Sequence, residues 1–75
     1  MPLTLAEIGE QSRIVRITGR DKTRRHLANL GLVEGEKIMV VSRLAGNLIL
    51  SVKDSRLALD RDMASRIWIE RGELG

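Results

Sequence analysis

Apolar and polar residues alternate along most of this chain, which is the spacing of β-strands rather than of long helices. Residues 12–18, SRIVRIT, are rich in β-branched side chains and lie between turn signals at Gly9 and Gly19, so they predict a first strand. Further strands are predicted at 37–43, 48–53, 56–60 and 66–70. Short connections between five short strands predict an all-β fold, a small, strongly bent, five-stranded antiparallel barrel with one short inserted helix.

The inserted helix begins at Asp21, where the spacing of apolar residues changes. Thr23, Leu27 and Leu30 fall at i, i+4 and i+7, so they share one face, and Asp21 is suited to the N-cap. Gly31 follows at the position where helices often end in a left-handed residue. The pattern therefore predicts a Schellman ending, in which the next residue packs back onto Leu27.

A second glycine has a different predicted role. In VEGE, residues 33–36, Gly35 is the third residue of a four-residue turn, and a type II turn requires a positive φ there. After this turn the predicted second strand begins, and residues 44–47, LAGN, predict a loop before the third strand. We interpret Gly31 and Gly35 as structural residues of turns rather than as a recognition loop.

The two ends of the chain carry weaker signals. Thr4 and Glu7 have the spacing of a capping box, which predicts a helical turn at 5–8 with Leu5 and Ile8 facing inward. We expect residues 1–9 to form an N-terminal turn and residues 70–75 a frayed tail, within one domain spanning 1–75. Near the C-terminus, Asp60 is placed to cap a single helical turn over RDMAS.

Alternation also assigns faces to the later strands. Leu48, Leu50 and Val52 alternate in the third strand, and Leu57 and Leu59 alternate in the fourth. In the fifth strand, Ile67 and Ile69 are expected inward and Trp68 on the opposite face. Because aromatic residues make up only 1% of the chain and hydrophobic residues 43%, we expect a core of Leu, Ile and Val.

The composition excludes several kinds of site and favours others. The chain has no cysteine, which excludes a disulfide framework and a thiolate metal site and favours a reducing cytoplasm. No window approaches the roughly 18 apolar residues of a membrane span, so we expect a soluble protein. The net charge is +3, but residues 13–25 carry six basic side chains and one acid, a local balance of +5. Such a patch is either a solvated face or a site for an acidic partner, whether nucleic acid, protein or anionic lipid.

No pattern of residues points to catalysis. GLVEGEK, residues 31–37, lacks the spacing of a phosphate-binding loop and runs from helix to strand, so no helix N-terminus faces a phosphate. His26 is the only histidine and has no cysteine or second histidine to share a metal. We predict that the protein is not an enzyme and holds no cofactor and no metal ion of its own.

Candidate contact residues remain on the surface. Arg24 and Arg25 lie in the first turn of the predicted helix, where cations oppose the helix dipole, so an acidic partner could compensate them. Trp68 either covers the barrel end beneath the N-terminal turn or anchors a partner. Arg16 and Met39 complete the candidate set, Arg16 within the basic patch and Met39 as apolar surface.

Two segments of the chain are informative together: RRHLANLGLVEGEKIMVV, residues 24–41, and GNLILSVKDSRLALDRDMASRIWI, residues 46–69. Both resemble the FeoA proteins, small cytoplasmic components of bacterial ferrous iron uptake. The resemblance covers residues 3–69, with departures at Glu34, where the family often has proline, and in the LAGNL loop. It implies an SH3-like barrel and a partnership with FeoB, the membrane transporter of ferrous iron, which has a cytosolic GTPase domain. A similar domain is also the last domain in the chain of iron-dependent repressors of the diphtheria toxin repressor type.

The expected function is therefore a protein-binding accessory module of ferrous iron transport. It would act on the cytosolic side of FeoB, with possible recruitment to the inner face of the membrane and weak self-association. Recognition of proline-rich peptides is excluded because that groove needs several aromatic rings. Small barrels also bind RNA, and the basic patch and a pI near 10.2 permit this alternative, although stacking platforms of Phe and Tyr are absent. No DNA partner is expected.

Overall fold

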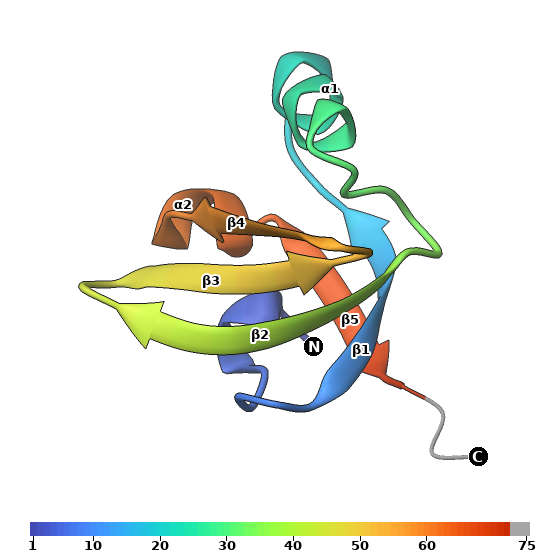
Figure 1. The fold of residues 1–75 in the computed structure, drawn as a ribbon. Coiled ribbons are helices and arrows are strands. Elements are labelled where there is room, and N and C mark those ends of the chain that lie inside the picture. The colour runs from blue at the N-terminus through green and yellow to red at the C-terminus, as the bar shows by residue number, and fades with distance from the viewer. Residues whose placement is uncertain (73–75) are drawn as a thin grey trace.

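Five antiparallel strands and three short helical segments build the fold, which is seen here in a computed structural model that describes residues 1–72 (Figure 1). The strands form one sheet in the order β4-β3-β2-β1-β5. The segments are η1 (Leu3–Leu5), β1 (Gln11–Ile17), α1 (Asp21–Asn29), β2 (Lys37–Leu44), β3 (Asn47–Val52), β4 (Ser55–Leu59), α2 (Arg61–Ala64) and β5 (Ile67–Arg71). The predicted five-stranded antiparallel fold with one inserted helix is confirmed.

The core is aliphatic, as the composition predicts. The alternating residues of β3 are all buried, and so are Ile67 and Ile69 of β5, whereas Leu57 of β4 is only partly buried. The core comprises Leu3, Ala6, Ile14, Ile17, Leu27, Leu32, Ile38, Val40, Leu48, Leu50, Val52, Leu59, Ala64, Ile67 and Ile69.

Two β-bulges bend the sheet. The register between β1 and β5 shifts between Ile14 and Arg16, and the register between β2 and β3 shifts between Val40 and Ser42. A bulge adds one residue to a strand and so breaks its alternation of faces. As a result Val15 and Arg16 are both exposed, although simple alternation would place one of them inside.

Helix α1 ends as its sequence predicts. The N–H of Gly31 donates to the Ala28 carbonyl at 2.9 Å, and the N–H of Leu32 donates to the Leu27 carbonyl at 2.9 Å. This pair of bonds defines a Schellman ending, and Gly31 has the left-handed φ of +91° that it requires. Leu27 and Leu32 are both fully buried, so the predicted ending is confirmed.

The turn after α1 is also confirmed. Gly35 has a φ of +91°, and the N–H of Glu36 donates to the Val33 carbonyl at 3.1 Å, as in the predicted type II turn. The turn is held against β1 because the N–H of Gly35 donates to the carbonyl of Ile14 at 2.7 Å.

The start of α1 differs from the prediction. Arg20, not Asp21, occupies the N-cap, and its side chain makes no capping hydrogen bond. Asp21 lies in the first turn of the helix, where its negative carboxylate interacts favourably with the positive end of the helix dipole. At the other end of the predicted apolar face, Leu30 is exposed, so only Leu27 anchors the helix through a fully buried side chain.

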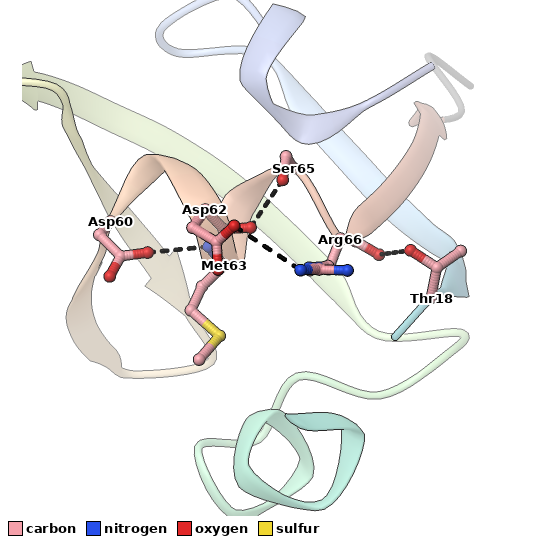
Figure 2. Close-up of polar contacts among 6 residues, drawn as sticks. All are labelled: Thr18, Asp60, Asp62, Met63, Ser65 and Arg66. Carbon is pink, nitrogen blue, oxygen red and sulfur yellow. Dashed lines mark hydrogen bonds and ion pairs between the residues drawn. The ribbon is translucent and has the colours of Figure 1, made fainter. Parts of the chain in front are cut away.

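Helix α2 is a single capped turn. The carboxylate of Asp60 accepts a hydrogen bond from the N–H of Met63 at 2.8 Å, which confirms the predicted cap (Figure 2). Arg66 forms an ion pair with Asp62 at 3.7 Å, and the backbone carbonyl of Arg66 accepts a hydrogen bond from the Thr18 hydroxyl at 3.3 Å (Figure 2). The segment after α2 is thereby joined to the end of β1.

The N-terminal turn buries different residues from those predicted. Leu5 and Ile8 are 64% and 55% exposed, whereas Leu3 is fully buried. The 3₁₀ turn starts after Pro2 with no side-chain cap, so the capping box does not form. The reason is a long-range contact: the chain start pairs with β5, with the N–H of Ile69 donating to the Met1 carbonyl at 2.7 Å. That pairing turns Leu3, not Leu5, toward the core.

The C-terminal strand ends one residue later than the strand predicted at 66–70. Arg71 belongs to β5, and the N–H of Gly72 donates to the Gln11 carbonyl at 2.7 Å. Arg71 also forms an ion pair with Glu10 at 2.9 Å. The frayed tail predicted at 70–75 is therefore wrong for residues 70–72, and residues 73–75 lie outside the described residues.

Candidate functional site

Six basic side chains of β1, of α1 and of the N-cap residue before α1 are exposed, and together we call them the basic surface. They are Arg13, Arg16, Arg20, Lys22, Arg24 and Arg25. Three ion pairs occur in residues 1–72, and none involves this surface; they join Lys53 to Glu36, Arg66 to Asp62 and Arg71 to Glu10. The charge excess predicted for residues 13–25 is thus solvent-exposed and lacks a carboxylate partner within the described chain.

The register of β1 and β5 places Arg16 directly opposite Trp68. Both side chains are on the outer face, and Trp68 is 40% exposed. Val15, which lies at the bulge, is also exposed. An arginine, an indole ring and an apolar side chain therefore share one part of the surface, which is the composition favoured at the centre of protein interfaces.

Trp68 is partly covered and partly exposed. Its backbone pairs with Pro2, so the N-terminal segment covers one side of β5 as the packing interpretation requires. The residue as a whole is 40% exposed.

Arg24 and Arg25 occupy different surroundings on α1. Arg24 lines a shallow cleft of about 330 Å³ between α1 and the end of β1. Apolar side chains form most of this cleft, and one carboxylate residue, Glu34, also borders it. Arg25 is exposed and lies outside this cleft. The predicted pair is therefore split between a cleft edge and open solvent.

Met39 does not join the other candidates. It is partly buried on β2, opposite Gln11 of β1 and Ser51 of β3. Gln11 and Arg16 are five residues apart on the same strand, a separation of roughly 16 Å. The structure thus brings Arg16 and Trp68 together and leaves Met39 toward the other end of β1.

One positioning residue could not be found by sequence reasoning. The guanidinium of Arg43, near the end of β2, donates to the backbone carbonyls of Thr4, at 3.3 Å, and Ala6. These contacts hold the N-terminal turn against the β2–β3 hairpin. No local pattern signals them, because the partners are 37 and 39 residues away in sequence and accept through backbone atoms.

His26 is exposed on α1. Within residues 1–72, no three His, Cys, Asp or Glu side chains are grouped closely enough to hold a metal ion. In the same part of the chain, no helix has the length and apolar character needed to cross a membrane.

A comparison with models of known protein families shows to which family the chain is related. The model of the FeoA domain matches residues 1–71. The chain belongs to the FeoA family. A relative from Methanocaldococcus jannaschii, provisionally named Fe(2+) transport protein A, is 31% identical over 74 residues, which are 99% of this chain and 90% of that protein. The resemblance read from the sequence is confirmed.

Solved FeoA structures share the fold. The crystal structure of an iron uptake regulatory protein (FeoA) superposes with a TM-score of 0.88 at 30% identity, covering 95% of each chain. FeoA of Stenotrophomonas maltophilia, crystallised with zinc and described as an SH3 domain protein, gives a TM-score of 0.80 at 24% identity, covering 93% and 89%. The predicted SH3-like architecture of the FeoA chain is confirmed.

The fold also occurs outside transport proteins. A manganese-dependent transcriptional repressor gives a TM-score of 0.86 at 20% identity, with 95% of this chain matched to 41% of the repressor. At this identity the likeness concerns the fold alone. FeoA-like barrels thus occur as separate chains and as parts of larger proteins.

Proposed function

We propose that this FeoA protein is a non-catalytic accessory module of ferrous iron transport that binds the cytosolic GTPase domain of a FeoB-type transporter. Family membership supports the link to iron transport. The observation that carries the partner assignment is the basic surface, which is exposed and unpaired in residues 1–72 beside the exposed ring of Trp68. An acidic protein face with an apolar centre complements such a surface.

We assign different roles to the residues of this surface. Trp68 and Arg16, held opposite each other by β1 and β5, would form the anchoring centre, since Trp and Arg dominate binding energy at interfaces. Arg24 and Arg25 would steer association, because exposed charges mainly raise the rate of encounter. The module would act in the cytoplasm and reach the inner face of the membrane through its transporter.

A double charge reversal tests the steering role. Association of Arg24→Glu/Arg25→Glu with the purified GTPase domain would be measured by stopped flow at about 50 mM and about 300 mM salt. We expect association to slow by about tenfold at low salt, with a smaller effect at high salt. Lys53→Glu/Arg56→Glu on the β3–β4 hairpin is the control, with the same change in net charge outside the basic surface.

Two outcomes would contradict the proposal. An unchanged association rate at low salt would show that the basic surface is only a solvated face. Alternatively, RNA binding would appear as affinity for any single-stranded oligonucleotide, and the double variant would reduce the log–log salt slope by about one to two. Binding of RNA but not of the GTPase domain would replace the proposed partner with nucleic acid.

The anchoring centre is tested by its own variants. A double-mutant cycle compares the dissociation constants of the GTPase domain for the parent, Trp68→Ala, Arg16→Ala and the double variant. We expect each single variant to weaken binding by about tenfold or more, mainly through faster dissociation, and the two losses to be non-additive because the residues are neighbours. Full affinity in Trp68→Ala would exclude this centre.

A further inference from the structure

A second surface lies where the β2–β3 hairpin, η1 and α2 come together (Figure 1). A groove of about 510 Å³ opens between these three segments. Its lining residues are Thr4, Leu5, Arg43, Gly46, Leu48, Arg61 and Ser65. We call it the hairpin groove, and none of its lining residues belongs to the basic surface.

The hairpin groove combines an apolar floor with an apolar wall. Leu48 is buried at the floor, whereas Leu5 stands in the wall with 64% of its surface exposed. Gly46 lies in the tight turn between β2 and β3, where it has a φ of +85° and carries no side chain that would narrow the opening. The groove can therefore take an apolar side chain and remove Leu5 from water.

Both charged side chains of the groove are arginines. Arg43 is already held by the Thr4 and Ala6 carbonyls, so little rotamer entropy remains to be lost when it binds a ligand. Arg61 begins α2 on the other side of the groove. Within residues 1–72, neither arginine forms an ion pair. The basic residues that do form one in this part of the chain are Lys53, Arg66 and Arg71.

From this charge complementarity we propose that the hairpin groove binds a segment of a partner protein in which an apolar side chain is flanked by carboxylates. The apolar side chain would pack on Leu48 and Leu5. A carboxylate would receive the free guanidinium N–H groups of Arg43 or Arg61, since arginine binds carboxylates with paired hydrogen bonds. This inference goes beyond the proposed function, because it uses a separate surface and does not require the GTPase domain.

A blocked peptide, acetyl-Glu-Leu-Leu-Glu-amide, serves as the probe in a titration of the ¹⁵N-labelled protein followed by NMR. We expect amide shifts at Gly46, Leu48 and Ser65, which line the groove. Replacing both glutamates of the peptide by glutamine, or both leucines by serine, should weaken binding by about tenfold or more, because each removes one half of the complementarity.

Variants of the protein assign the binding to the groove. Arg61→Glu should weaken the acidic peptide by about tenfold, whereas Arg56→Glu, with the same charge change on exposed β4 surface outside the groove, should change affinity by less than about twofold. Leu5→Ser should also weaken binding while leaving the fold intact, because this side chain is largely exposed. Arg43 is not varied, since its loss would release the N-terminal turn.

Several results would overturn the proposal. Shifts confined to α1 and β1 would place the peptide on the basic surface, and equal affinity for the glutamine peptide would remove the role of the arginines. Co-sedimentation with phosphatidylglycerol vesicles that is lost in Leu5→Ser and Arg61→Glu, without any peptide binding, would identify a lipid surface as the occupant. Failure of the GTPase-domain experiments leaves the peptide titration unaffected, so the two proposals fail separately.

Discussion

Replacing Gly31 with valine tests the link between a local backbone conformation and the stability of the whole domain. Gly31 has a φ of +91° and ends α1 through the two hydrogen bonds of the Schellman motif. An L-residue in this region costs of the order of 1–3 kcal/mol, and a β-branched side chain belongs at the upper end. We expect Gly31→Val to lose about 2–3 kcal/mol of unfolding free energy.

The magnitude comes from the backbone rather than from a collision. A Cβ added at Gly31 would lie 3.9 Å from Cγ1 of Val52, which is an ordinary contact distance. For a domain of this size, about 1 kcal/mol corresponds to roughly 4–8 °C in Tm, so we expect a decrease of about 10–20 °C. The total stability of such a domain is only about 4–11 kcal/mol, so the loss is a large fraction of it.

Urea unfolding of Gly31→Val, followed by circular dichroism and by the fluorescence of Trp68, measures this loss. Gly31→Asn is the conservative control, because Asn tolerates left-handed conformations and should lose less than half as much. Ala28→Val places the same side chain in the helix, where it should cost only about 0.5 kcal/mol. The reasoning is refuted if Gly31→Val unfolds within about 0.5 kcal/mol of the parent. A parent-like melt combined with lost partner binding would make Gly31 a recognition residue.

Three further predictions concern the core, a helix cap and iron. Leu27→Ala removes the fully buried anchor of α1 and should cost about 3–5 kcal/mol in urea unfolding, and a loss below about 1 kcal/mol would mean that α1 is not anchored there. Asp60→Ala removes the cap of α2 and should cost about 1 kcal/mol, while Asp60→Asn retains an acceptor and should restore most of it, as thermal melts would show. Anaerobic calorimetry with Fe²⁺ should give no stoichiometric micromolar site; such a site, abolished by His26→Ala, would contradict the prediction.

Several features that depend on neighbouring residues were predictable from the sequence, although the capping box at Thr4 and the N-cap at Asp21 were not. The Schellman ending at Gly31, the turn at Gly35 and the cap at Asp60 each involve hydrogen bonds that span five residues or fewer. Glycine at a positive φ and a carboxylate before a helical turn satisfy these local requirements almost regardless of the rest of the fold. Alternation likewise identified Leu48, Leu50 and Val52 as core residues, because one face of that hairpin is buried.

The candidate site was only partly predictable. The charge excess at residues 13–25 was visible in the sequence, but the pairing of Arg16 with Trp68 depends on the register of strands 52 residues apart and on a bulge beside Val15. No local pattern shows that Met39 lies near the opposite end of β1 from Arg16, so the sequence alone does not separate it from the other candidates.

Tertiary contacts alone decided which residues of the N-terminal turn are buried and where the hairpin groove lies. Leu3 faces the core because Met1 and Pro2 pair with β5, and Arg43 fixes this turn from β2. The energies of these contacts arise only after segments distant in sequence have met, so local propensity carries no information about them. The sequence by itself therefore determined the strands, the inserted helix and the turns at Gly31 and Gly35, while the folded chain determined the N-terminal turn and which exposed side chains share a surface.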